Sequence, residues 1–162
     1  MESVAAHSWG VAWLVALCCP PELHRERALL LALVHDLPEV RVGDITPADG
    51  VPKAEKRRLE AAAAASLLAE TPELLAAWRE YEANETAEAR FVHELDRLDM
   101  GLQALAAGRA ADAPDLTEFI ESADRGIRAP ALRALWTAAQ RLAPPRQGAP
   151  LSPPATAARD RR

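Results

Sequence analysis

A histidine followed directly by an aspartate, His35 and Asp36, ends an aliphatic run that begins at Leu29. A charged carboxylate at the end of a buried helix is costly unless water, a charged partner or a metal ion compensates it. His7 and Asp96 add a second imidazole and a second carboxylate near apolar faces of other predicted helices. Such a nitrogen and oxygen ligand set, without a thiolate, suits one divalent cation: Mn²⁺, Co²⁺, Fe²⁺, Ni²⁺ or Zn²⁺.

Each of these residues, taken alone, also has an ordinary structural explanation. A single histidine near an apolar helix face is more often a core or surface residue than a ligand. Asp96 could equally pair with Arg97. His93 lies three residues before Asp96 and shares its helix face, so it is either a further ligand or a surface residue. His24 is expected to face solvent. Spacing alone therefore indicates a metal only weakly.

The elements that would position these residues are all predicted to be helical. The chain is rich in Ala and Leu and poor in aromatic and β-branched residues, which favours an all-α fold. A loop is expected over residues 37–52, where Pro and Gly recur. Apolar periodicity, prolines and capping residues predict helices over residues 3–18, 21–36, 53–70, 72–82, 87–107, 116–123 and 130–142.

Length and composition limit the organisation of the chain. The 162 residues suit one domain, predicted over 1–143, followed by a Pro-, Ala- and Arg-rich tail over 144–162 that we expect to be disordered. The net charge of -5, without a basic stripe, argues against nucleic acid as a partner. The adjacent Cys18 and Cys19 imply no disulfide framework and favour a reducing, cytoplasmic setting. The N-terminus does not resemble a signal peptide, and the apolar runs are too short to span a membrane.

Several short motifs in order resemble the HD-domain superfamily and, more narrowly, its 5'-deoxynucleotidase branch. They are E-S-V-x-x-H-S at residues 2–8, H-D-x-x-E at 35–39, G-D-I at 43–45 and E-L-D-R-L-D-M at 94–100. The ordered pattern H…HD…D is the metal signature of that superfamily, and the first three motifs are more specific to the branch. The resemblance extends over about residues 2–107, roughly two-thirds of the chain.

The resemblance implies a compact bundle of about six to seven helices that acts as a metal-dependent phosphomonoesterase. Its substrates would be nucleoside and deoxynucleoside 5'-monophosphates, and a homodimer is expected. Glu39 and Asp44 match the branch's two acidic positions beside the metal, which orient or deprotonate the attacking water and serve the leaving oxygen. Without the resemblance, both would be interpreted as solvated loop residues. By the same match, one divalent metal would be held by His7, His35, Asp36 and Asp96.

Two other interpretations remain open. One is an HD hydrolase with another phosphorylated substrate, which the E-S-V and G-D-I motifs disfavour. The other is a truncated HD-fold metal-binding or interaction module without turnover. Relatives in this branch carry a further helix ahead of the E-S-V motif, with an Arg–Trp or similar pair that helps to bind the nucleotide. We expect either a start further upstream or a natural truncation, which would leave Trp9 and Trp13 partly exposed.

Overall fold

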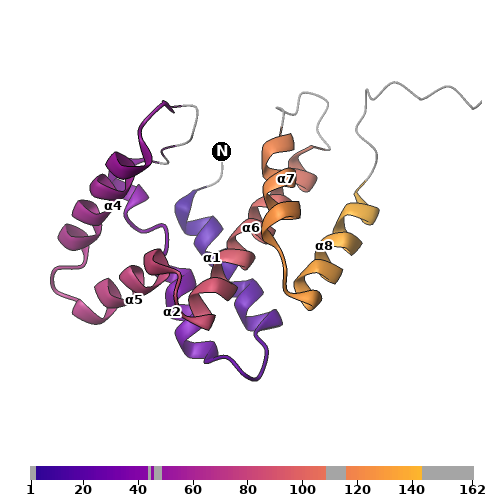
Figure 1. The fold of residues 1–162 in the computed structure, drawn as a ribbon, viewed down its shortest axis with the longest axis horizontal. Helices are drawn as coiled ribbons and strands as arrows, with labels where there is room; N and C mark the ends of the chain where they lie inside the picture. Colours follow the sequence, from indigo (N-terminus) through magenta and orange to yellow (C-terminus); the bar gives the residue numbers. More distant parts are fainter. Residues whose placement is uncertain (1–2, 44, 46–48, 109–115, 144–162) are drawn as a thin grey trace, which may run out of the picture.

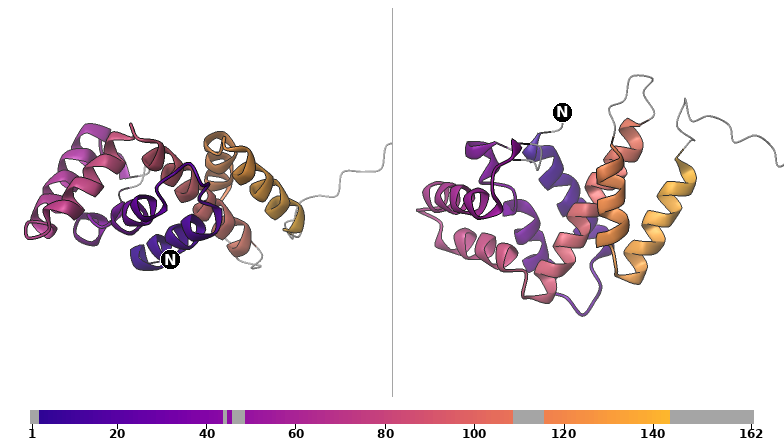
Figure 2. Two further views of the ribbon diagram at one scale, coloured as in Figure 1. Left: turned by 90° about the horizontal axis from the view of Figure 1, so that it is seen from below. Right: turned by 45° about the horizontal axis from the view of Figure 1, so that its top comes forward.

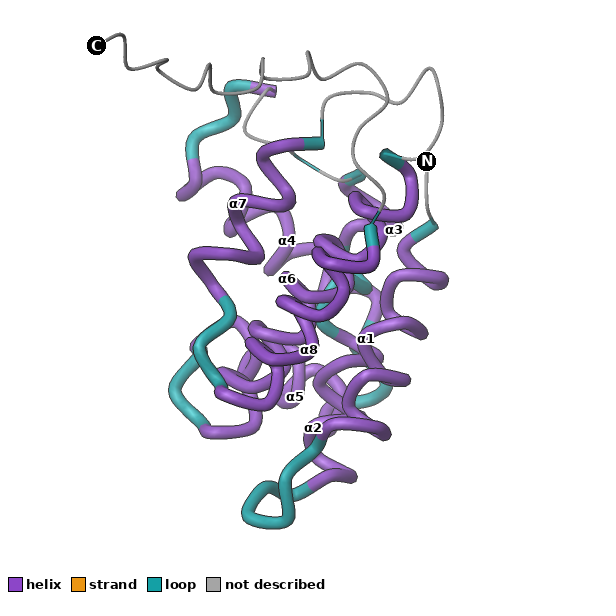
Figure 3. The backbone as a smooth tube through the Cα atoms, turned by 90° about the vertical axis from the view of Figure 1, so that its right-hand side faces the viewer, coloured by secondary structure: helices purple, strands orange, loops and turns teal. Residues whose placement is uncertain are grey.

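The computed structural model describes residues 3–43, 45, 49–108 and 116–143. Within these ranges the chain forms seven helices of ten residues or more and one single helical turn, with no strand (Figures 1 and 3). The all-α prediction is confirmed. The helices are α1 (Val4–Cys18), α2 (Arg25–Val34), α3 (Glu39–Val42), α4 (Lys53–Leu67), α5 (Pro72–Ala83), α6 (Ala87–Ala107), α7 (Thr117–Gly126) and α8 (Pro130–Leu142).

Two helices begin at side-chain caps that the sequence displays. The Ser3 side chain accepts a hydrogen bond from the backbone N–H of Ala6 at the start of α1, at 3.1 Å. Thr86 caps α6 in the same way through the N–H of Ala89, also at 3.1 Å. Both hydroxyls satisfy a helix N–H that lacks an intrahelical partner. These caps set the start of the two helices that carry His7 and Asp96.

The predicted boundaries of the second helix and of the loop after it are wrong. The helix begins at Arg25 rather than near residue 21, because the chain first turns through a hydrogen bond from the Leu23 N–H to the Pro20 carbonyl. It ends at Val34, shortly before Pro38, which cannot continue an α-helix with a full set of hydrogen bonds. Inside the predicted loop, Glu39–Val42 form the single turn α3, which stops at Gly43.

Two other boundaries move by about one helical turn. The helix predicted over 53–70 ends at Leu67, and the helix predicted over 116–123 extends to Gly126. Thr71 precedes α5 as predicted, but its hydroxyl bonds back to the Leu68 carbonyl instead of capping the helix. Predictions for Asp44 and for the tail over 144–162 concern residues outside the described ranges.

The long helix α6 is the centre of the bundle. It packs against α1, α2 and α5 and also against α7 and α8. In the views of Figures 1 and 2, α4 and α5 lie on one side of it and α7 and α8 on the other. Its predicted apolar stripe is the core: Phe91, Leu95 and Leu98 are buried, while Leu102 and Leu105 pack against them. One rigid helix thus supplies both core contacts and site residues.

Close contacts between helices stabilise both sides of the bundle. On the α8 side, fully buried Trp136 fits against Gly101 of α6, where any side chain would collide with the indole ring. On the other side, Arg27 of α2 donates two hydrogen bonds to Glu80 of α5, at 2.5 and 2.8 Å. Among the described helices, none combines the length and hydropathy that crossing a bilayer requires.

Candidate metal centre

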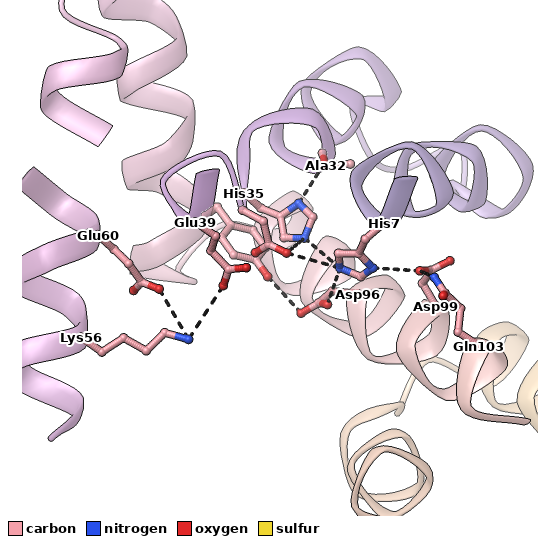
Figure 4. A network of polar contacts seen from close by, with 11 residues as sticks. His7, Ala32, His35, Glu39, Lys56, Glu60, Asp96, Asp99 and Gln103 are labelled. Carbon is pink, nitrogen blue, oxygen red and sulfur yellow. Dashed lines mark hydrogen bonds and ion pairs between the residues drawn. The ribbon is translucent and has the colours of Figure 1, made fainter. Parts of the chain in front are cut away.

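Three segments distant in sequence bring two histidines and two aspartates together. His7 lies in α1, His35 and Asp36 follow the last residue of α2, and Asp96 lies in α6. One ligand atom from each of His7, His35 and Asp96 falls within 4.8 Å of the others (Figure 4). Asp36 lies outside that group of three but reaches both rings, with Oδ2 3.2 Å from Nε2 of His35 and 3.5 Å from Nε2 of His7.

The two imidazole rings are oriented by acceptors on their outer nitrogens. Nδ1 of the buried His35 donates to the carbonyl oxygen of Ala32 at 2.8 Å. Nδ1 of His7 donates to the carboxylate of Asp99 at 2.9 Å. A carbonyl and a carboxylate can only accept, so both Nδ1 atoms carry protons. The two Nε2 atoms, 3.3 Å apart, are therefore available to a proton or a metal ion.

Asp96 is held on both of its oxygens. Oδ1 lies 3.2 Å from Nε2 of His7, and Oδ2 accepts a hydrogen bond from the hydroxyl of Tyr81 at 3.2 Å. Burial and the nearby Asp96 charge raise the pKa of Tyr81 well above its usual range, so the hydroxyl stays a donor. Sequence reasoning missed Tyr81. The available signal was the chain's single tyrosine on an amphipathic helix, because a buried phenol needs a hydrogen-bond partner.

Asp99, also missed by sequence reasoning, supports His7 from behind. Its Oδ2 accepts from Nδ1 of His7 and, at 2.6 Å, from the side-chain amide of Gln103. Gly10 leaves room for this carboxylate, since a Cβ atom there would lie 2.5 Å from Oδ1 of Asp99. The signal was helical spacing: Asp99 follows Asp96 by three residues, as Gly10 follows His7, so each pair shares one face.

The carboxylates make the histidine pair strongly basic. Burial alone would lower the pKa of His7, but hydrogen bonds to Asp96 and Asp99 and the charge of Asp36 outweigh it and raise the pKa to about 10. Burial would also lower the pKa of His35, but Asp36 and Asp96 outweigh this effect and raise the pKa. Burial would raise the pKa of Asp96, yet its contacts with the histidines hold it below the usual value. The cluster therefore attracts a cation.

Glu39 begins α3, three residues after Asp36, and its side chain is only 14% exposed. Its Oε1 lies 3.9 Å from Nζ of Lys56, which lies 3.5 Å from Oε1 of Glu60 and donates to the carbonyl of Ile45 at 2.9 Å (Figure 4). Lys56 of α4 thus joins α3 to the segment that precedes α4. The expectation of an ordinary solvated residue at Glu39 does not fit this burial.

The remaining histidines lie outside the cluster. Nε2 of His93 donates to the carbonyl of Tyr81 at 3.0 Å, and its ring stacks on the Tyr81 ring with centroids 3.9 Å apart. Burial lowers the pKa of His93, which favours its neutral form. His24 is exposed, as predicted. His93 therefore packs behind Tyr81 and is not among the residues that could share a metal with His7.

The spacing of the cluster fits the donor set of one metal ion. Two ligand atoms that each lie about 2.1 Å from a metal ion, with a ligand–metal–ligand angle of about 90°, are about 3 Å apart. The separations between Nε2 of His7 and its neighbours are 3.2 Å to Asp96, 3.3 Å to His35 and 3.5 Å to Asp36. Neutral imidazole nitrogens and carboxylate oxygens with fixed outer partners are typical of catalytic metal sites.

The described residues form a helical protein in which α6, α1 and the end of α2 together build a site of histidines and aspartates. A sequence model described as HD domain matches residues 1–136, and the chain belongs to this family. The ordered His7, His35–Asp36 and Asp96 pattern, which carried the resemblance in the sequence, lies within that match.

Several curated proteins similar to this chain are 5'-deoxynucleotidases. The chain is 46% identical over 109 residues to the 5'-deoxynucleotidase HDDC2 of Xenopus laevis, covering 64% of this chain and 54% of the relative. Against HDDC2 of Homo sapiens the identity is 43% over 108 residues, covering 64% and 53%. The 5'-deoxynucleotidase hdd1 of Schizosaccharomyces pombe is 37% identical over 128 residues, covering 73% and 65%. The match spans about half the length of the first two relatives.

Solved structures agree on the fold. A conserved hypothetical protein from Pyrococcus furiosus superposes with a TM-score of 0.70 at 29% identity, covering 87% of this chain and 84% of that one. A predicted metal-dependent phosphohydrolase from Magnetospirillum magnetotacticum gives a TM-score of 0.65 at 29% identity, covering 86% and 80%.

Proposed function

We propose that this chain is a metal-dependent phosphomonoesterase that hydrolyses deoxynucleoside 5'-monophosphates to deoxynucleoside and phosphate. The observation that carries the proposal is the convergence of two Nε2 atoms and two carboxylates, with both histidines oriented by outer acceptors. The 5'-deoxynucleotidase relatives support the reaction and the substrate class. The proposed metal ligands are His7, His35, Asp36 and Asp96.

A divalent cation bound there, Mn²⁺, Co²⁺, Fe²⁺, Ni²⁺ or Zn²⁺, would neutralise phosphoryl charge and lower the pKa of a water molecule. The protein's own groups supply the rest. Glu39, at the start of α3 and three residues after Asp36, is proposed to accept the proton of the attacking water. Nζ of Lys56 lies 3.9 Å from Oε1 of Glu39 and limits the motion of this carboxylate. Asp44 is proposed to serve the leaving 5'-oxygen.

Tyr81 and Asp99 act on the ligands, not on the substrate. The Tyr81 hydroxyl fixes one oxygen of Asp96, so the other is directed to His7. The Asp99 carboxylate holds the Nδ1 proton of His7 and increases electron density at Nε2. Both positioning residues are buried, so their orientation is set by packing.

A homodimer in a reducing, cytoplasmic setting is part of the proposal. Trp9, Trp13 and Leu17 recur at every fourth residue of α1 and are 65%, 53% and 63% exposed, which offers an apolar surface to a second copy. The partial exposure predicted for the two tryptophans is confirmed. Cys18 and Cys19 are free thiols, which supports a reducing compartment.

The test is phosphate release from matched nucleotides. Metal-loaded protein should hydrolyse deoxynucleoside 5'-monophosphates faster than ribonucleoside 5'-monophosphates, and both faster than the 3'-isomers. A Glu39→Gln variant is the matched control, because it preserves shape and metal ligands while removing the proton acceptor. Equal rates on 5'- and 3'-monophosphates would contradict the substrate assignment. Metal binding without turnover of any monophosphate would favour an interaction module.

A further inference from the structure

A second polar cleft, separate from the candidate metal centre, opens between α6, α7 and the turn before α8. Its volume is about 520 Å³. Arg90, His93 and Arg97 line it from one face of α6, and Arg125 and Arg128 line it from α7 and the following turn. The packing of α6 against α7, visible in Figure 1, brings these residues together although more than 25 positions separate the two groups in sequence.

Three of the four arginines in this cleft have no ion-pair partner among the described residues. No described carboxylate lies within ion-pair distance of Arg90, Arg97 or Arg128, whereas Arg125 pairs with Glu121 at 3.1 Å. Arg90 donates to the backbone carbonyl of Glu85, which leaves its charge in place. A concentration of positive charge in a hollow is notable in a chain whose net charge is -5.

The nearest carboxylate in the cleft is already occupied by the backbone. Glu94 Oε2 accepts hydrogen bonds from the N–H groups of Arg128 and Ala129, each at 2.8 Å, at the start of α8. The glutamate therefore satisfies two backbone donors of the turn before α8 and is not bonded to a guanidinium group, so its charge offsets only one of the three arginine charges. Gly126 lets α7 approach closely, because a Cβ atom there would collide with the stem of Arg97. Arg97 is thus confined within the cleft wall.

These features point to a multiply charged oxyanion as the ligand. Guanidinium groups bind phosphate oxygens with two parallel hydrogen bonds, and three unpaired ones match an anion of two or more charges. A volume of about 520 Å³ lies in the range of sites for nucleotide-sized ligands. A single carboxylate would compensate only one of the three charges.

We propose that the cleft lined by Arg90, Arg97 and Arg128 is a second anion site that binds the phosphate groups of a nucleotide. It lies behind the metal centre: His93 in its wall stacks on Tyr81, whose hydroxyl holds Asp96. Free phosphate shares the same chemistry, and the size of the cleft favours a phosphate chain over orthophosphate. The site does not require turnover at the metal centre.

Calorimetric titration of the protein as purified tests this assignment with two probes, deoxyadenosine triphosphate and orthophosphate. The variant is the double substitution Arg90→Gln and Arg128→Gln, at two exposed side chains. Arg58→Gln on α4 is the matched control, since it also removes an exposed arginine but lies far along the chain from the cleft. Loss of charge-assisted hydrogen bonds should weaken triphosphate binding at least about tenfold in the double variant and less than about twofold in the control.

The single substitution Arg128→Glu provides a second test if the double variant is poorly folded, and it should weaken binding by more than Arg128→Gln does. Binding of orthophosphate as tight as that of the triphosphate would identify free phosphate as the ligand. Undiminished triphosphate binding in both cleft variants, or binding lost only in an Asp36→Ala variant, would overturn the second site. Because the readout is binding, failure here leaves the phosphate-release test of the proposed function unaffected.

Discussion

The substitution Asp99→Asn removes the negative charge beside His7 while keeping a side chain of the same shape. Asp99 is 7% exposed, and its Oδ2 receives hydrogen bonds from His7 at 2.9 Å and Gln103 at 2.6 Å. The asparagine oxygen can accept both bonds, so the packing is preserved while the negative charge is lost. We expect His7 to become a weaker base and a weaker metal ligand.

The magnitude follows from the pKa of His7. Raising this pKa from 6.5 to about 10 corresponds to about 5 kcal/mol of net favourable interaction, which remains after the contributions of Asp96, Asp99 and Asp36 have offset the cost of burial. An equal share for Asp99 is between about 1 and 2 kcal/mol, which is roughly tenfold in the proton affinity of His7. A divalent ion carries twice the charge of a proton, so we expect a loss of at least about tenfold in metal affinity at a pH where His7 has lost its proton. This value is at the lower end of the range of about 10–100-fold for partners of ligating histidines.

Competition with a chelator of known affinity measures the effect with Co²⁺ or Mn²⁺. Asp124→Asn is the control: Asp124 also accepts a side-chain hydrogen bond, from the Trp136 indole at 2.7 Å, but lies on α7 away from the cluster. The control should bind metal like the parent protein. Parental metal affinity in Asp99→Asn, within twofold, would refute the role given to this carboxylate.

Three further outcomes are expected. Asp36→Ala should abolish metal retention and turnover, measured by metal analysis and phosphate release. Glu39→Ala should retain the metal and lose about 100-fold or more in kcat. An unchanged kcat in Glu39→Ala would contradict the role of Glu39 as proton acceptor. Gly101→Ala should lower the free energy of unfolding by about 1–3 kcal/mol in urea titrations despite its better helix propensity, because Cβ would meet Trp136 at 2.9 Å; a stabilised variant would contradict this packing. In the metal-free protein, the raised pKa of His7 contributes stability that is fully present below pH 6.5 and is lost as pH rises toward about 10. Metal competes with the His7 proton, so metal affinity should rise with pH over this window. Metal affinity that does not change with pH would contradict the assignment of His7 as a ligand.

The sequence was sufficient to predict the fold class and the convergence of the cluster, for identifiable reasons. His7, His35 and Asp96 each lie on or beside a helix whose apolar period was clear, and the ordered motifs indicated that the helices meet. The predicted start of α2 was wrong because the turn after Pro20 depends on one backbone hydrogen bond. The turn α3 was missed because four residues are too few for a periodic signal.

The residues that support the ligands could not be identified in the same way. Tyr81 and Asp96 belong to different helices, and the phenol finds its acceptor only after α5 packs on α6. Asp99 could have been a surface aspartate until α1 brought His7 and Gly10 against it. The sequence did not indicate the arginine cleft either, because Arg128 comes from a turn that the packing of α7 brings beside Arg90 and Arg97.

A metal titration of chelator-treated protein, with a deoxynucleoside 5'-monophosphate as substrate, tests the proposed metal centre by following metal binding and phosphate release together. Turnover should rise with added metal and saturate at one ion per chain, and His7→Ala should abolish both signals. Turnover that persists without metal, or full activity in His7→Ala, would contradict the claim that these helices assemble a catalytic metal centre.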